Sequence, residues 1–214
     1  YEGKEILNLH GAPACEDCLA KTAEEAVNTA KNIDGDTVLK IVSPDILHKS
    51  DIGGVRVKLN TESEVRSAFK EIIQNARRFD EDVDIRGVAV SPMAEEGIEV
   101  IIGTKMDDQF GPIIMYGLGG ILVEVLKDVS FSVLPISWAA AKKMVGETKS
   151  YPILKGFRGS APSDERAVIG LLVKCSEIIE AYPEIQEMDL NPVIVHEKGL
   201  TIVDVRIIMK PERG

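Results

Sequence analysis

Apolar residues recur at helical spacing after two copies of the same local signal. Thr22-Ala23-Glu24-Glu25 and Thr61-Glu62-Ser63-Glu64 each place a glutamate three positions after a threonine, just before an apolar-periodic stretch. Such a pair satisfies free N–H groups at the start of a helix, so both segments predict helix N-termini. A third helix is predicted to begin at Pro162-Ser163-Asp164-Glu165 and to end at Pro183, and a shorter one covers 137–145.

Runs of apolar and β-branched residues between turn signals predict the strands. These runs are 37–42, 55–59, 85–90, 98–103, 112–116, 188–195 and 200–207. Strands and helices do not alternate regularly, which favours an α+β fold with largely antiparallel sheets over a doubly wound fold. A lobe boundary near Ser91-Pro92-Met93 predicts an N-terminal lobe of residues 1–92 and a C-terminal lobe of residues 93–214. The segment 118–149 permits several assignments.

The composition is that of an ordinary globular protein, with 214 residues of which 44% are hydrophobic and 28% charged. Its longest apolar runs are far shorter than the roughly 20 residues that a membrane-spanning helix needs. The first residues lack the basic start and apolar core of a signal peptide, and three cysteines without repeated spacing fit a reducing compartment, so we expect a cytoplasmic location. The net charge of -10 opposes binding to nucleic acid.

The segment 43–54 joins two predicted strands but is too long and polar for an efficient hairpin turn. It carries His48, Lys49 and Ser50, which are able to contact or accept a phosphoryl group, and it ends in Gly53-Gly54, where a ligand can approach the backbone closely. The alternative is a surface histidine in an ordinary loop. The combination favours a phosphate-handling loop.

Basic residues on the flanking strands support the same interpretation. Alternation along 55–59 places the three apolar residues on one face and Arg56 and Lys58 on the other. Lys40 interrupts an apolar run, and a lysine buried without a partner is costly, so an anionic ligand explains it economically. A position on an edge strand is the alternative explanation for Lys40.

Oxygen-bearing side chains gather near the C-terminus. Period-two alternation places Asp189 and Asn191 on one face, and Asp204 stands alone in the next apolar run. Carboxylate and amide oxygens suit Mg²⁺, which proteins hold with a few side chains together with nucleotide phosphates. The alternative is that Asp189 and Asn191 form turn or edge hydrogen bonds and that Asp204 pairs with Arg206 or another cation. Both interpretations stay open at this point.

Other motifs do not support a site of their own. Cys15-Glu16-Asp17-Cys18 is a lone pair of cysteines without the further ligands that a zinc site requires. Gly117-Leu118-Gly119-Gly120 follows an apolar strand, but Leu122 stands where a dinucleotide fingerprint has its third glycine. A Walker-type phosphate loop and a nucleophile elbow have no matching sequence.

Five segments match one known family: 40–55, which contains His48-Lys49-Ser50-Asp51, and 109–112, 117–120, 123–128 and 188–192. Together they resemble the ATP-grasp beta subunits of ADP-forming acetyl-CoA synthetases, over about residues 4–209. The resemblance implies an ATP-grasp fold in which two α+β lobes clasp a nucleotide. It also implies a separate CoA-binding alpha subunit, in an alpha2-beta2 heterotetramer, from which a phosphoryl group reaches ADP.

The resemblance also implies roles for individual residues. His48 would be a phosphohistidine on a loop, and Mg²⁺ would be held by Asn191 and Asp204 with Asp189 beside them. ADP or ATP, as the substrate, would meet Lys40, the loop residues Leu47 and Lys49, the hinge Ser91, Pro92, Met93 and Ala94, and Glu99 in the cleft. From the loop and strand pattern we add Gly53, Gly54, Arg56 and Lys58 to the nucleotide-binding set.

A competing hypothesis assigns the chain to a different functional class. It is a nucleotide-sensing regulatory module of a larger acyl-CoA synthetase-like or acetyltransferase protein, suggested by the absence of a CoA or acyl site in the sequence. An ATP-grasp ligase acting alone is disfavoured, because little sequence follows Asp204.

Overall fold

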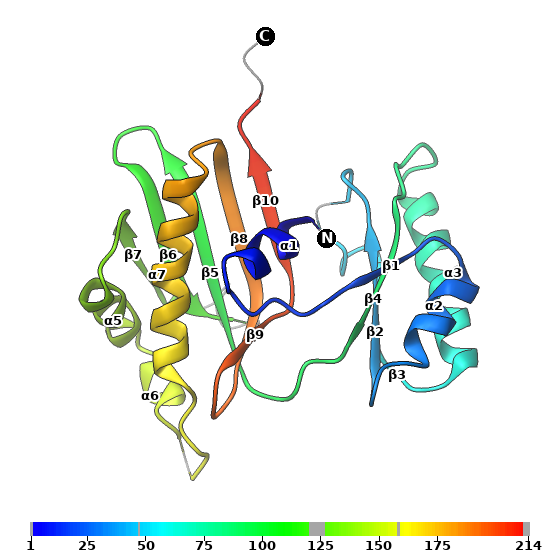
Figure 1. Cartoon of the computed structure of the whole chain (residues 1–214), viewed down its shortest axis with the longest axis horizontal. Coiled ribbons are helices and arrows are strands. Elements are labelled where there is room, and N and C mark those ends of the chain that lie inside the picture. Colours follow the sequence, from blue (N-terminus) through cyan, green and yellow to red (C-terminus); the bar gives the residue numbers. More distant parts are fainter. Residues whose placement is uncertain (1, 47, 120–126, 158, 212–214) are drawn as a thin grey trace. The chain divides into compact units, whose positions relative to one another are not determined.

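The computed structural model describes residues 2–46, 48–119, 127–157 and 159–211 (Figure 1). The chain divides into two compact units, one formed by Cys15–Met93 and the other by Glu2–Ala14 together with Ala94–Gly214. The sequence-based division assigned the first fourteen residues to the N-terminal lobe. The structure groups residues 2–14 with the second unit instead, because Leu7, Ala12 and Ala14 belong to its apolar core.

The first unit is a four-stranded sheet with two helices on one face (Figure 1). The strand order is β1-β4-β2-β3, and every neighbouring pair is antiparallel. Leu39 and Ile41 of β2 pack with the helices in one buried core, so the residues between them face the other way. The elements are β1 (Cys18–Ala20), α2 (Ala23–Ala30), β2 (Thr37–Val42), β3 (Val55–Leu59), α3 (Glu62–Phe79) and β4 (Gly87–Pro92).

Both helices of this unit begin at the threonines that the sequence predicts. At α3 the capping box is complete, because Thr61 accepts a hydrogen bond from the N–H of Glu64 while the Glu64 carboxylate accepts from the N–H of Thr61. At α2, Thr22 accepts from the N–H of Glu25, but the Glu25 carboxylate accepts from the N–H of Lys21 instead. The helix starts are therefore confirmed.

Strand β3 does not alternate regularly as the sequence pattern suggests. Its pairing with β2 shifts between Thr37 and Leu39, and Lys58 has a left-handed backbone with φ of 59°. This irregularity inserts an extra residue, which reverses the direction of the side chains that follow. Val57 is consequently exposed while Leu59 is buried, so the prediction that they share a face is wrong.

The second unit is built on a larger antiparallel sheet of order β10-β8-β5-β6-β7, with β9 paired to β8. Helices α5 and α7 share a buried core with the strands, and α1 packs against β10 (Figure 1). The predicted strand at 200–207 is two strands, separated at Val203 and Asp204. The elements are α1 (Glu2–Leu9), β5 (Ile98–Asp107), β6 (Gly111–Leu118), β7 (Val129–Val133), α5 (Trp138–Glu147), α6 (Tyr151–Leu154), α7 (Glu165–Ala181), β8 (Ile185–Val195), β9 (Leu200–Ile202) and β10 (Val205–Met209).

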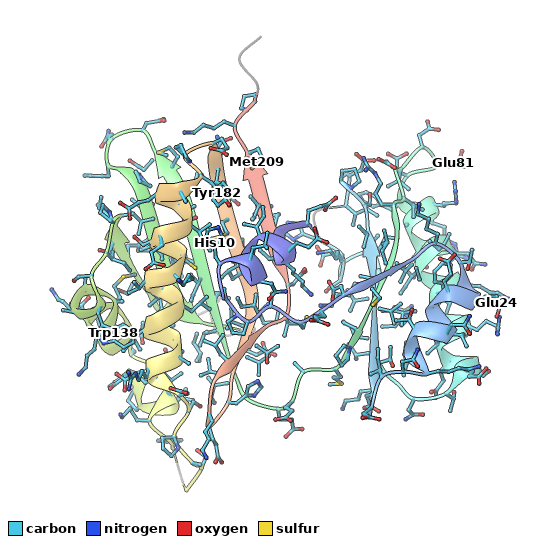
Figure 2. All side chains as sticks on the ribbon, viewed as in Figure 1. His10, Glu24, Glu81, Trp138, Tyr182 and Met209 are labelled. Atoms are coloured by element: carbon cyan, nitrogen blue, oxygen red, sulfur yellow. The ribbon has the colours of Figure 1, made fainter. Side chains whose placement is uncertain are left out.

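Side-chain hydrogen bonds fasten the ends of α7. At its start, Asp164 accepts hydrogen bonds from the N–H groups of Ala167 and of Gly199 in the β8–β9 turn. At its end, the Tyr182 hydroxyl lies 3.0 Å from His10 Nε2, and the two rings meet edge to face (Figure 2). Segments distant in sequence are thereby tied to one helix.

The predicted α+β class with antiparallel sheets is confirmed, since the pairings between the strands named above are antiparallel. An isolated bridge between Ala14 and Ile202 is parallel. Among the described residues, no helix combines the length and the apolar character needed to cross a membrane.

Candidate functional site

Lys40 lies in the middle of β2, paired with Ala89 of β4 and Val55 of β3. It is therefore on an interior strand, which excludes the edge-strand explanation. Its neighbours Leu39 and Ile41 point into the helix-side core, so Lys40 is on the opposite face of the sheet. The residue is only 7% exposed, so its side chain lies in a low-dielectric setting. Such a position suits a group that contacts an anionic ligand.

His48 is exposed on the segment between β2 and β3. Before it, Ile46 is buried in the core, and the Asp45 carboxylate accepts a hydrogen bond from the N–H of Asp84. After it, the N–H of Gly54 donates to the carbonyl oxygen of Lys49 at 2.7 Å. The imidazole therefore lies on a short stretch with hydrogen-bonded or buried residues on both sides. Leu47 lies outside the described residues.

The two glycines that end this segment have a packing role. A Cβ on Gly54 would lie 2.7 Å from the Ile41 side chain and 2.8 Å from the Lys49 carbonyl oxygen. Gly53 has φ of 66°, and a Cβ there would lie 2.9 Å from the Asn75 side chain. The close approach is to the protein itself, and contact with a ligand stays a prediction for both residues.

Arg56 does not share a face with Lys58 as the sequence pattern predicts. Its Nε lies 3.3 Å from the Glu71 carboxylate on α3, and its Nη1 donates to the carbonyl oxygen of Gly53 at 3.0 Å. The backbone irregularity in β3 explains the difference, because it reverses alternation after Arg56. Lys58 is exposed.

The predicted hinge begins at the end of β4. Ser91 is buried and pairs with Val38, two residues from Lys40, so it lies on the same face as that lysine. The N–H of Met93 donates to the carbonyl oxygen of Asp36 at 2.8 Å, whereas Pro92 is exposed. Ala94 is partly buried and is the first residue after the first unit.

Glu99 is exposed on β5, on the face of the second sheet opposite the helices. Its neighbours Ile98 and Val100 pack in the helix-side core, which fixes this orientation. The N–H of Gly119 donates to the Glu99 carbonyl oxygen at 2.6 Å, and a Cβ on Gly119 would lie 2.9 Å from that of Glu99. Part of the Gly117–Gly120 motif therefore serves close packing beside Glu99, and residues 120–126 lie outside the described part.

Asn191 and Asp204 come together at the junction of β8 and β10. The N–H of Asn191 donates to the carbonyl oxygen of Asp204 at 3.1 Å, and the following pair in the register is Leu190 with Val205. One side-chain oxygen of Asp204 accepts the N–H of Val205 at 3.1 Å. The strand break before β10 thus holds an amide and a carboxylate on adjacent backbone positions.

Asp189 pairs with Arg206 in the register, and Arg206 forms an ion pair with Glu187 at 2.5 Å. Asn191 is exposed and Asp204 partly buried, so their oxygens border solvent. Two hard oxygen donors on facing strands fit a magnesium ion that also keeps water and phosphate ligands.

Asp128, at the end of another matching segment, fastens a turn. Its carboxylate accepts hydrogen bonds from the N–H groups of Lys149 and Ser150. Burial raises the pKa of Asp128, but the hydrogen bonds from Ser150 and Lys149 outweigh it and hold the pKa below its usual range. The sequence contained no turn or capping signal that linked Asp128 to residues twenty positions away.

A shallow cavity of about 490 Å³ lies elsewhere in the second unit and is lined by residues of α5 and α7. Because these helices cover the face opposite Glu99, the cavity is separate from the candidate residues of that sheet. Its lining residues are Trp138, Lys142, Glu165, Arg166 and Ile169.

Two antiparallel sheets with candidate nucleotide-binding residues on their strands are typical of one class of protein, and comparison with known proteins supports this class. Residues 1–209 match the model of the ATP-grasp domain family. The chain therefore belongs to the ATP-grasp family.

Its relatives narrow the assignment. The chain is 46% identical over 213 residues to the beta subunit of ADP-forming acetate–CoA ligase II of Pyrococcus furiosus, covering 98% of this chain and 90% of that protein. A solved structure of dinucleotide-forming acetyl-coenzyme A synthetase 1 from Ca. Korarchaeum cryptofilum, with coenzyme A and Ca-AMPCP, matches with a TM-score of 0.94 and 47% identity over 98% of this chain and 91% of that one. Within the ATP-grasp family, the chain belongs with the beta subunits of ADP-forming acetate–CoA ligases.

A further structure of the Korarchaeum enzyme also matches this chain. It has a TM-score of 0.84 and 45% identity, covering 98% of this chain and 91% of that chain. It contains coenzyme A and Mg-AMPPCP, and its phosphohistidine segment points towards the nucleotide-binding site.

Proposed function

We propose that this chain is the nucleotide-binding beta subunit of an ADP-forming acyl-CoA synthetase and transfers a phosphoryl group to ADP. The complete reaction converts acyl-CoA, ADP and phosphate into acid, ATP and CoA. The observation that carries the proposal is His48, an exposed imidazole on a fastened loop in a chain of this family. Acetate is the acid product in the proposal, following the curated relatives.

His48 suits the final transfer chemically. A neutral imidazole is a nitrogen nucleophile near pH 7, and its phosphorylated form is reactive enough to phosphorylate ADP. In the transfer, the phosphorus–nitrogen bond breaks while a bond forms to a β-phosphate oxygen of ADP, and the ring nitrogen takes up a proton. Nearby lysines such as Lys49 offset the phosphate charge during this in-line displacement.

Each unit supplies its own groups for the nucleotide in this proposal. From the first unit, Lys40, Lys49 and Lys58 contact phosphate or adenine, and the backbone of residues 91–94 binds the adenine edge. In the second unit, Glu99 contacts the nucleotide, while Asn191 and Asp204, with Asp189 beside them, hold Mg²⁺. The bound ion would offset negative charge on the phosphates. Leu47, Gly53, Gly54 and Arg56 remain predicted members of the nucleotide-binding set.

The name of the Pyrococcus relative as a beta subunit implies an alpha partner, and we propose a CoA-binding alpha subunit in an alpha2-beta2 heterotetramer. A cytoplasmic location belongs to the same proposal. The nucleotide-sensing module is not favoured, because the curated relatives are acetate–CoA ligases themselves.

The proposal is tested with radioactive ATP labelled in its γ-phosphate. Wild-type protein should acquire acid-labile, base-stable label on His48, and His48→Ala should acquire none while keeping its thermal unfolding midpoint. His10→Gln is the matched control, since His10 contacts Tyr182 in the second unit and should leave labelling unchanged. Reversible nucleotide binding without any label would support the sensing module instead.

The complete reaction gives a second test. Mixed with its alpha subunit, acetyl-CoA, phosphate, Mg²⁺ and ADP, the wild-type chain should make ATP, and His48→Ala should not. Full activity of His48→Ala would exclude the relay role.

A further inference from the structure

Two side chains from different elements meet at one backbone oxygen, the carbonyl of Gly53. Arg56 Nη1 donates to it at 3.0 Å from β3, and Asn75 Nδ2 donates to it at 3.2 Å from α3. A carbonyl oxygen has two lone pairs, and these two donors use both. Gly53 lies five residues after His48, at the end of the loop that carries the imidazole.

Helix α3 holds both donors in place. Ser67, Glu71 and Asn75 are spaced four residues apart, so they lie on one face of the helix. Ser67 Oγ lies 3.2 Å from one carboxylate oxygen of Glu71, and Arg56 Nε lies 3.3 Å from the other. The guanidinium is therefore oriented by a carboxylate that is itself hydrogen bonded, which pre-organises the contact with Gly53.

The fastened carbonyl is connected to His48 through a tight turn. Gly53 N–H donates to the Ser50 carbonyl oxygen at 3.0 Å, and Gly54 N–H donates to that of Lys49 at 2.7 Å. The Gly54 carbonyl oxygen in turn accepts from the N–H of Ile41 in β2 at 2.8 Å. Fixing Gly53 therefore fixes the position of Lys49, the residue directly after the imidazole.

We propose that Arg56 and Asn75 are positioning residues for His48. By hydrogen bonding to Gly53, they fix the end of the loop that carries the imidazole. The inference rests on the proposed function of His48 in phosphoryl transfer. For Arg56, this role in loop geometry replaces the nucleotide contact that the strand pattern predicts. Phosphoryl transfer is sensitive to such positioning because the reacting atoms must be close and aligned.

Three variants in the complete alpha–beta complex test the proposal. Arg56→Met and Asn75→Leu each remove one donor to the Gly53 carbonyl and leave an apolar side chain that suits the strand or the helix. The double variant removes both donors. Arg66→Met is the matched control, because Arg66 is also an arginine of this unit paired with a glutamate, Glu24 of α2. Amide hydrogen exchange at Gly53 and Gly54, kcat, KM for ADP and the rate of His48 labelling are measured for each.

The double variant should exchange the Gly53 and Gly54 amides faster and lose kcat and labelling rate about tenfold, because two hydrogen bonds to the loop base are gone. KM for ADP should stay within about twofold, because the proposal places neither side chain at the nucleotide. Arg66→Met should match wild type in all four measurements.

The outcomes distinguish failure of the proposed function of His48 from failure of the positioning role of Arg56 and Asn75. A wild-type complex without label on His48 overturns the proposed function, whatever the exchange rates are. A labelled wild type together with a double variant of unchanged kcat overturns the positioning role, as does a double variant whose amides exchange at the wild-type rate. A rise in KM for ADP that accounts for the lost activity also overturns it and returns Arg56 to the nucleotide site.

Discussion

The N–H of Asn191 donates a hydrogen bond to the carbonyl oxygen of Asp204 at 3.1 Å, across the junction of β8 and β10. This backbone contact joins the two residues that we propose as magnesium ligands, and it does not depend on either side chain. Substitutions of the side chains should therefore change metal affinity without removing the contact that fixes the strands.

Asp204→Asn should bind Mg-ADP at least about tenfold more weakly than wild type, because it removes a negative charge from the proposed ligand pair. Isothermal titration with ADP should be performed with Mg²⁺ and with EDTA, since the difference should disappear without the metal. Asp108→Asn, in the exposed β5–β6 turn, removes the same charge elsewhere and should bind normally. Equal losses of ADP affinity with and without Mg²⁺ would show that Asp204 affects nucleotide binding without holding the metal.

Lys40→Met should lower ADP affinity while leaving the protein folded. Methionine keeps most of the length of the side chain in a position that is 7% exposed, and it removes only the cation. A loss of about tenfold or more is expected if the ammonium contacts phosphate in this low-dielectric setting. Fluorescence titration with ADP and thermal unfolding separate the two effects, and normal affinity would remove Lys40 from the nucleotide site.

Local signals in the sequence predicted the parts of the fold that depend on local physics. Thr61 with Glu64 marks the start of α3, and an acidic cap at Asp164 with the apolar stripe behind it marks α7. These signals succeed because capping groups and helical periodicity act within a few residues. Long-range packing determines α1 and the three-residue strand β1, which lack such signals.

In the candidate site, too, local sequence signals predicted some residues, and long-range packing determines the others. Asp204 was chosen as a candidate because a lone acid in an apolar run is unusual, and the structure places it beside Asn191, another candidate. The direction of Arg56 was missed, because a single backbone irregularity at Lys58 cancels the alternation that the prediction assumed. Asn75 carried no signal at all, since its contact with Gly53 depends on how α3 packs over the loop.

Asp164 should contribute to stability in a pH-dependent manner. Hydrogen bonds from the N–H groups of Gly199 and Ala167 hold the pKa of its carboxyl below the usual range. A depressed pKa in the folded state means that the stabilisation is complete above the pKa of the unfolded state, about 3.9, and is lost as the pH falls through the folded value.

Asp164→Ala should lower the free energy of unfolding by roughly 1–2 kcal/mol at pH 7, the usual cost of losing a helix cap. Urea denaturation at pH 7 and at pH 3 measures the change, and the difference between variant and wild type should shrink at the lower pH. Asp164→Asn should be intermediate at pH 7, since it keeps one acceptor oxygen. A difference that stays constant with pH would contradict the assigned role of the charge.

Cys18 and Cys175 should differ sharply in reactivity. Cys175 is fully buried in α7, and burial raises the pKa of its thiol to about 12, whereas Cys18 is exposed at the start of β1. The thiolate is the reactive form, so both the raised pKa and the burial of Cys175 oppose its reaction in the folded protein. Iodoacetamide labelling followed by peptide mass spectrometry should modify Cys18 within minutes and Cys175 only after denaturant is added. A Cys175→Ala variant serves as the control for the assignment of the labelled peptide. Rapid modification of Cys175 in the native protein would contradict its burial in α7.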